Sequence, residues 1–141
     1  MTEQPNWDYH VDRWKPITGY EDLYLISQRG RVWRLDRYVN RVHTGPYLQR
    51  GGIMADWQAT PYGHRAVYLV DVNGRRKKYW IHRLVAEHFI PNPEGLPWVL
   101  HGPAGPSENY YTNLRWGNQS ENEKDKLRHK IVRQEQRHEG T

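Results

Sequence analysis

The chain has 141 residues and a formal net charge of +5, and only 36% of its residues are hydrophobic. We therefore expect one domain, or one small domain with an appended module, and a thin core. The absence of cysteine excludes disulfides and cysteine-type zinc sites, so a metal would need His, Asn, Asp, Glu or water as ligands. The positive charge favours a nucleic-acid partner, with a solvated basic surface as the alternative.

Aromatic residues carry most of the apolar bulk, with seven Trp and ten Tyr. Such side chains fill small cores, and they also stack on nucleobases. No apolar run of 18 residues occurs, which predicts a protein without a membrane span. We expect a soluble, cytoplasmic protein.

The first predicted unit covers residues 14–35. A strand over Leu23–Ser27, a turn at Gln28–Gly30 and a return strand over Arg31–Leu35 are indicated by β-forming residues around a glycine. Residues 36–63 show no sustained periodicity. We expect a loop there with at most one short strand.

The next predicted unit is a hairpin, with strands over His64–Val70 and Arg75–Ile81 around Asn73-Gly74. Its return strand opens with four consecutive cations, Arg75–Lys78, which either grip phosphates or form a solvated face. A short helix over His82–Phe89 follows, with three apolar residues expected to face the core: Leu84, Val85 and Phe89.

The last predicted unit comprises two strands, Trp98–His101 and Asn113–Trp116, joined by a polar loop. A capping box of Ser120 and Glu123 predicts a helix from there to about residue 136. That helix is basic and would lie against a duplex, or it is simply solvated. Its cations include Lys124, Lys126 and Arg128.

The spacing of His101, Asn113 and Asn122 in this unit predicts a nuclease site. Phosphodiester hydrolysis needs a base for water and a cation for the charge that develops on the phosphate and the leaving 3′ oxygen. His101 would be the general base. Asn113 would orient its imidazole or brace the loop, and Asn122 would bind a divalent metal. Oxygen ligands favour Mg²⁺ or Mn²⁺, with Zn²⁺ or Ni²⁺ possible.

Three stretches from about residue 79 to residue 126, IHRLVAEHFIPNP, VLH and NLRWGNQSEN, resemble the HNH endonuclease family in its phage-type form with Asn at the third position. The resemblance implies that His101 is the general base, Asn113 the residue that positions it and Asn122 the metal ligand. His82 and Arg83 match the His-Arg pair that opens the helix before the motif. His82 is either a metal ligand or a residue that packs at the helix start.

The segment 14–32 is similar to the modular N-terminal DNA-binding motif of homing endonucleases. The matching residues are Trp14, Ile17, Gly19, Tyr20, Glu21, Ser27, Gly30, Arg31 and Val32. The alternative is a basic hairpin that only packs on the nuclease body.

One position departs from the family, because Leu100 stands where many homing enzymes have an Asp or Asn metal ligand. Either Asn122, waters, phosphate oxygens and a substitute such as His82 or Asn109 hold the metal, or the enzyme is weak or only binds DNA.

The resulting hypothesis is an α+β protein with a basic, β-rich DNA-binding module over residues 1–63 and a ββα-metal (His-Me finger) nuclease over 64–141. It would cut double-stranded DNA in the host cell of a phage or mobile element, as a monomer or a homodimer. A single-stranded or RNA binder is a further alternative. The residues predicted to contact DNA are Arg29, Arg31, Arg34, Arg75, Arg76, Lys77, Lys78, Arg83, Arg115, Lys124, Lys126 and Arg128.

Overall fold

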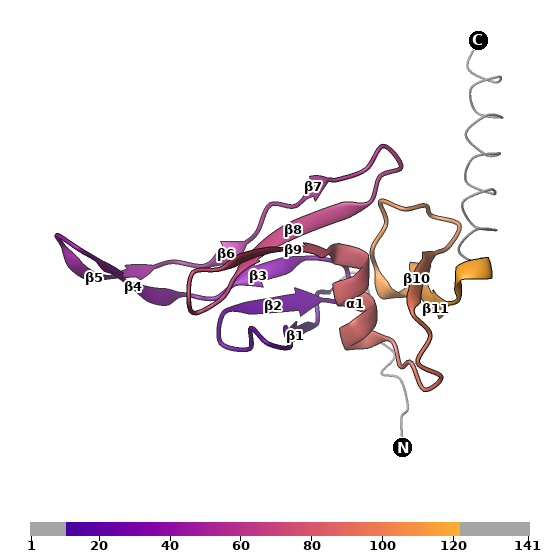
Figure 1. Cartoon of the computed structure of the whole chain (residues 1–141), viewed down its shortest axis with the longest axis horizontal. Coiled ribbons are helices and arrows are strands. Elements are labelled where there is room, and N and C mark those ends of the chain that lie inside the picture. Colours follow the sequence, from indigo (N-terminus) through magenta and orange to yellow (C-terminus); the bar gives the residue numbers. More distant parts are fainter. Residues whose placement is uncertain (1–10, 122–141) are drawn as a thin grey trace, which may run out of the picture.

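The computed structural model describes residues 11–121 as a strand-rich α+β fold in which the main helix has nine residues (Figure 1). Its β-strands within that range form one four-stranded, one three-stranded and two two-stranded antiparallel sheets. The elements are β1 (Trp14–Pro16), β2 (Tyr24–Ser27), β3 (Val32–Arg34), β4 (Arg37–Arg41), β5 (Gly45–Gln49), β6 (Gly52–Ile53), β7 (Trp57–Gln58), β8 (Arg65–Val70), β9 (Arg76–Trp80), α1 (Ile81–Phe89), β10 (Trp98–His101), η1 (Tyr111–Asn113) and β11 (Leu114–Gly117).

The first sheet has the order β1-β2-β3-β6, and its central hairpin confirms the two strands predicted before residue 36. The turn between β2 and β3 needs a left-handed residue, which Gly30 supplies with φ of 83°. Ile26 and Val32 from this sheet are buried, and so is Ile17, which directly follows β1. The sheet therefore contributes directly to the protein core.

The prediction of a loop over residues 36–63 was wrong. β4 and β5 pair over five residues in a hairpin that extends far from the rest of the molecule, and β6 and β7 follow (Figure 1). None of the described side chains on β4 and β5 is buried. Because a hairpin with no buried face needs no alternation of apolar and polar residues, its sequence carries no strand signal.

The third sheet, β7-β8-β9, confirms the predicted hairpin. Gly74 adopts a φ of 79° in the connecting loop, where the Asp71 carboxylate accepts hydrogen bonds from the backbone N–H groups of Asn73 and Arg75. On β8, Val67 and Leu69 are buried while Tyr68 between them is exposed. This alternation identifies the inner and the outer face of the sheet.

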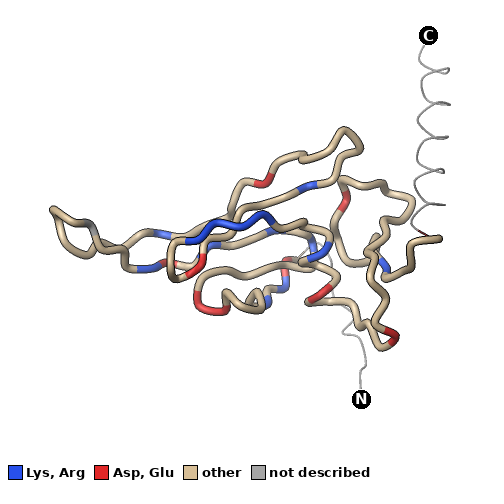
Figure 2. Tube along the Cα trace, in the orientation of Figure 1, with Lys and Arg blue, Asp and Glu red and all other residues tan. Residues whose placement is uncertain are grey.

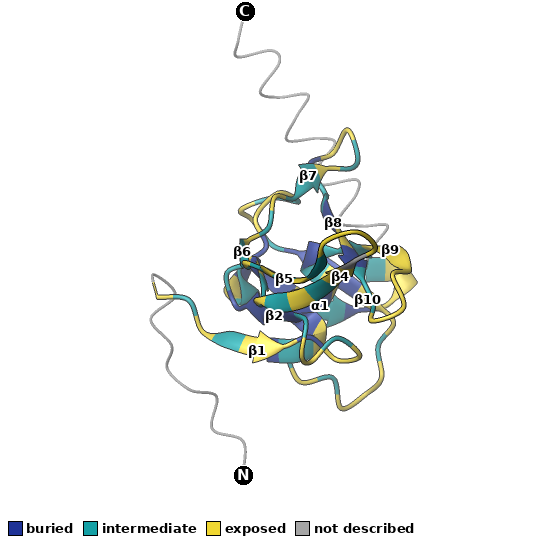
Figure 3. Ribbon diagram, turned by 90° about the vertical axis from the view of Figure 1, so that its left-hand side faces the viewer, coloured by how far each residue is buried: buried dark blue, intermediate teal, exposed yellow. Residues whose placement is uncertain are grey.

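α1 lies between the first and third sheets and β10–β11 (Figure 1). Its apolar side faces the core as predicted, with Leu84, Val85 and Phe89 buried, and Figure 3 shows buried residues at the centre of the molecule with exposed ones around them. One cluster of buried side chains joins residues on both sides of residue 63. It contains Ile17, Tyr24, Ile26, Val32, Val67, Leu69, Ile81, Leu84, Val85, Ala86, Phe89, Val99 and Leu114. The division into residues 1–63 and 64–141 stays a prediction, and the core spans it.

β10 and β11 pair antiparallel, with His101 opposite Leu114, and the chain is helical over 119–121, where the described residues end. The predicted N-cap at Ser120 was wrong. The side-chain oxygen of Asn118 accepts the Glu121 N–H at 2.9 Å, so the helix begins two residues earlier. Among the described residues no helix combines the length and hydropathy needed to cross a bilayer.

Candidate functional site

His101 is the last residue of β10, and its side chain is 6% exposed. Its Nε2 lies 2.9 Å from the side-chain oxygen of Asn109, which is equally buried. A carbonyl oxygen can only accept, so Nε2–H donates and the neutral imidazole carries its basic lone pair on Nδ1. This is the tautomer arrangement that a general base requires.

Asn113 braces the loop between β10 and β11. Its side-chain oxygen accepts the Ala104 N–H, and its Nδ2 donates to the carbonyl oxygens of Gly105 and Glu108. Of the two roles considered for Asn113, the geometry matches loop bracing, whereas Asn109 holds the imidazole. Asn109 lies in a polar loop at a spacing that no pattern distinguishes, so its sequence position gave no indication of this role.

Two further histidine rings pack against His101. The ring centroid of His82, in the first turn of α1, is 4.9 Å from that of His101, and the centroid of His64, just before β8, is 5.5 Å away. The His64 and His82 centroids are 5.6 Å apart. His64 is fixed by a 2.9 Å contact of its Nδ1 with the Thr60 hydroxyl. We call His64, His82 and His101 the histidine cluster; sequence reasoning missed His64 because it stands alone before a strand.

Burial, followed by the charges of His101, His64 and Arg83, lowers the pKa of His82 from 6.5 to about 3. His82 is therefore neutral at physiological pH. Its Nδ1 is buried and has no hydrogen-bond partner within residues 11–121. A buried imidazole nitrogen with a lone pair and no partner has the chemistry of a metal ligand.

The predicted metal ligand Asn122 lies outside the described residues. Within residues 11–121, no group of three or more His, Asp or Glu side chains could hold a metal ion. Leu100, which is 2% exposed, packs over Gly117 and offers no donor atom. The His, Asp and Glu side chains of the described residues therefore do not form a complete metal site by themselves.

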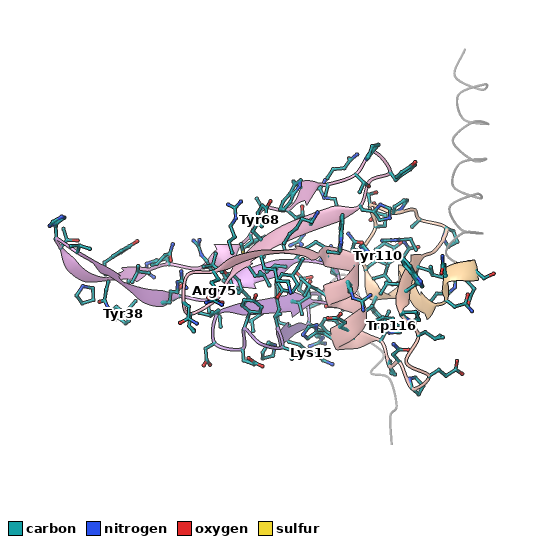
Figure 4. All side chains as sticks on the ribbon, viewed as in Figure 1. Lys15, Tyr38, Tyr68, Arg75, Tyr110 and Trp116 are labelled. Atoms are coloured by element: carbon teal, nitrogen blue, oxygen red, sulfur yellow. The ribbon has the colours of Figure 1, made fainter. Side chains whose placement is uncertain are left out.

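A row of cations runs along β9 (Figure 2). Lys78 pairs with Tyr68, the exposed residue of β8, so Lys78 and Arg76 lie on the outer face of the sheet. The guanidinium carbon of Arg76 lies 3.8 Å from the ring centroid of Tyr68, and Lys78 Nζ lies 4.4 Å from that of Trp80. Trp57 stacks on Tyr68 with centroids 4.7 Å apart. We call Arg76, Lys78 and these three aromatic residues the basic strip. Figure 4 shows Tyr68 projecting from β8 away from the core.

The basic strip leads to the histidine cluster. The Trp80 ring centroid is 5.9 Å from that of His82 and 6.3 Å from that of His64. Among the described residues neither Arg76 nor Lys78 has a carboxylate within ion-pair distance. Cation–π contacts hold both side chains but do not neutralise their positive charges, so these charges can attract an anion.

The other predicted DNA contacts differ in their surroundings. Arg29 and Arg31 both approach Asp12, at 3.8 and 3.5 Å, and Arg34 donates to the Arg50 carbonyl. Arg83 donates to the Pro97 carbonyl and pairs with Glu87, so it serves the packing of α1.

Three more of these cations are placed by the structure. Arg75 lies in the β8–β9 loop, Lys77 is 5.3 Å from the Tyr79 ring centroid, and Arg115 is exposed on β11. Lys124, Lys126 and Arg128 lie outside the described residues. All of these DNA contacts stay predictions.

Comparisons with known proteins identify relatives of this chain. Residues 12–67 match the model of the NUMOD4 motif. The DNA endonuclease I-HmuI of Bacillus phage SP01 is 30% identical over 114 residues, which are 81% of this chain and 57% of that protein. The uncharacterized HNH endonuclease L247 of Acanthamoeba polyphaga mimivirus is 34% identical over 115 residues, 77% of this chain and 24% of its own length.

A solved structure of the HNH homing endonuclease I-HmuI, which describes its DNA binding and cleavage, superposes with a TM-score of 0.61. The match is 30% identical and covers 82% of this chain and 57% of that one. The chain thus spans about half the length of the phage relative. It is a homologue of the HNH homing endonucleases and carries a NUMOD4 motif.

Proposed function

We propose that the protein is a divalent-metal-dependent DNA endonuclease whose general base is His101. The observation that carries the proposal is the buried hydrogen bond from His101 Nε2 to Asn109, which leaves the basic lone pair on Nδ1. In the proposed reaction, Nδ1 accepts a proton from water, the water oxygen attacks phosphorus, and the bond to the 3′ oxygen breaks. The two neighbouring histidine rings restrict the imidazole to one orientation.

His82 and Asn122 would hold the metal, with DNA phosphate and water completing its ligands. The support for His82 is its neutral, unpartnered Nδ1. The bound ion would stabilise charge on the phosphate and on the leaving 3′ oxygen. A nitrogen ligand suits Mn²⁺, Zn²⁺ or Ni²⁺ better than Mg²⁺, which prefers oxygen.

The basic strip would carry the DNA backbone toward the histidine cluster. Phosphates supply much of the affinity of proteins for duplex DNA. Cation–π contacts with Tyr68 and Trp80 hold Arg76 and Lys78 in place for such contacts. The β4–β5 hairpin would add a second contact, because a two-stranded ribbon is one of the shapes that the major groove admits.

A nicking assay tests the proposal. Supercoiled plasmid is incubated with the protein and Mg²⁺, Mn²⁺, Zn²⁺ or Ni²⁺, and the His101→Ala variant is run beside it. Loss of a general base should lower the cleavage rate by about 100-fold to 10,000-fold while duplex binding stays unchanged. Equal nicking by the variant would remove His101 from the mechanism.

A DNA-binding protein with a degenerate site is the second candidate, and the observation that favours it is Leu100. This candidate predicts salt-sensitive duplex binding with no cleavage in any of the four metals. Leu100→Asp separates the two, because an added carboxylate would strengthen a weak metal site and leave a pure binding protein without activity.

A further inference from the structure

The turn between β2 and β3 is tied together by its own hydrogen bonds. The hydroxyl oxygen of Ser27, which is fully buried, accepts the N–H groups of Arg29 and Arg31 at 3.3 and 3.1 Å. The Gly30 N–H donates to the Ser27 carbonyl, and the Ser27 N–H donates to the Arg31 carbonyl. Residues 27–31, which we call the β2–β3 turn, therefore form a rigid body within the NUMOD4 match.

Gln28 fixes this turn in the molecule. Its side chain is fully buried, with Nε2 donating to the Val11 carbonyl at 2.6 Å and Oε1 accepting the Arg13 N–H at 2.5 Å. Its backbone carbonyl accepts the Tyr111 N–H at 2.8 Å. One residue thus connects the segment before β1 with the start of η1.

Gly30 lies directly against Asn109. A Cβ atom at position 30 would be 2.8 Å from the Asn109 Cβ and 3.3 Å from its carbonyl oxygen, and 3.2 Å from Ile81. The first distance is shorter than real Cβ contacts, so only glycine fits without displacing Asn109. Asn109 in turn holds His101 at 2.9 Å.

We propose that the β2–β3 turn positions the His101 imidazole, with Gly30 and Gln28 acting as positioning residues through Asn109 and Tyr111. Two residues of the N-terminal motif, Gln28 and Gly30, thus help to fix the orientation of the His101 ring. The same turn contains Arg29 and Arg31, which are predicted to contact DNA. The β2–β3 turn therefore connects these predicted DNA contacts to His101, the proposed general base. The catalytic meaning of this arrangement rests on the proposed function, while the positioning itself does not.

The test compares two glycine variants with equal backbone strain. Gly30→Ala and Gly19→Ala both place a side chain at a positive φ, 83° and 88°, but nothing lies within 4 Å of a Cβ at position 19. The readouts are the cleavage constants and the ¹⁵N signals of the His101 ring, recorded without metal. Gly30→Ala should lower kcat by about 10-fold to 100-fold with KM unchanged, and shift the ring from the Nε2–H tautomer toward a mixture. Gly19→Ala should leave both readouts as in the parent chain.

A second pair serves if Gly30→Ala does not fold. Tyr111→Pro removes the backbone N–H that donates to the Gln28 carbonyl. Proline is tolerated here because Tyr111 is the first residue of η1 and the preceding Tyr110 is extended. Tyr111→Ala is the control, since it removes the ring and keeps the N–H. The proline variant should lose the Nε2–H signal of His101 more than the alanine variant. Identical His101 spectra for Gly30→Ala and Gly19→Ala, or for the two Tyr111 variants, would overturn the positioning role. A changed spectrum in a protein that cleaves no DNA would refute the proposed function and leave the positioning role standing.

Discussion

The β8–β9 hairpin and the β4–β5 hairpin have ladders of the same length but opposite relations to the core. Each pairs five residues with five. β8 buries Val67 and Leu69 against α1 and the first sheet, whereas no described side chain of β4 or β5 is buried. Tyr38 on β4 is 77% exposed, and Figure 4 places it on the extended hairpin, away from Tyr68, Tyr110 and Trp116. A hairpin shows alternating apolar and polar residues in its sequence only where one of its faces is buried.

The two hairpins also differ in what they carry. His64 precedes β8, and His82 follows β9 by two residues, so the base of the β8–β9 hairpin supplies two members of the histidine cluster. Its outer face supplies the basic strip. The β8–β9 hairpin thus links the candidate chemistry to candidate DNA contacts, whereas the β4–β5 hairpin supplies no residue of the histidine cluster.

The largest expected difference is in stability. Leu69→Ala empties a fully buried site on β8, so it should lower the free energy of unfolding by about 2–5 kcal/mol. Replacing Tyr38–Leu48 by Asn-Gly, which joins the paired residues Arg37 and Gln49, should change it by less than about 1 kcal/mol. Urea denaturation of both variants measures this. A hairpin replacement that destabilises as much as Leu69→Ala would mean that β4–β5 packs on the core.

The next difference concerns affinity for DNA. Arg76→Ala combined with Lys78→Ala should weaken duplex binding about 10-fold to 30-fold and reduce the salt slope by about 2, because two phosphate contacts are lost. Fluorescence anisotropy on a labelled duplex at several salt concentrations measures both values. Lys15→Ala is the control, since Lys15 donates to the His88 carbonyl on another face. Equal losses for Lys15→Ala and for one strip residue would indicate a general charge effect.

The smallest difference is in acid stability. The pKa of His82 falls from 6.5 in the unfolded chain to about 3 on folding, so below about pH 6.5 the unfolded chain takes up a proton that the folded chain excludes. Stability from this group is complete above pH 6.5 and falls progressively as the pH drops toward 3. We expect a loss of about 1–2 kcal/mol at pH 5, measured in a chelator.

His82→Asn should remove most of this acid sensitivity. His43→Asn, at the exposed turn of the other hairpin, should retain it. Parallel pH profiles for the parent chain and His82→Asn would contradict the assignment of the acid sensitivity to His82.

The elements with a buried face were predictable from local signals. α1 begins at Ile81 and β10 covers Trp98–His101, each within one residue of its prediction, because apolar periodicity and flanking prolines bound them. The cap at Asn118 was missed because Ser120 offers the same chemistry two residues later. Local sequence does not decide between two competing caps.

The candidate site was predictable only in part. The position of His101 at a strand end followed from its spacing, but its partner Asn109 and its neighbour His64 come from segments that tertiary packing alone brings together. The cation–π contact of Arg76 with Tyr68 depends on cross-strand register, which places Tyr68 opposite Lys78, whereas Lys78 and Trp80 lie two residues apart on one strand. Register follows from the whole sheet and not from the run of cations itself.

The buried cluster joins residues on both sides of residue 63, and this has a consequence for recombination between proteins that carry the NUMOD4 motif. The NUMOD4 match ends at Val67, in the middle of β8, and Leu69 on the same strand belongs to the same buried cluster. A chimera spliced at the motif's edge would set apolar side chains from two parents beside each other within a single strand. Productive exchange would instead require crossover points in exposed connections, such as the loop at Asn73, or co-inheritance of both packing surfaces.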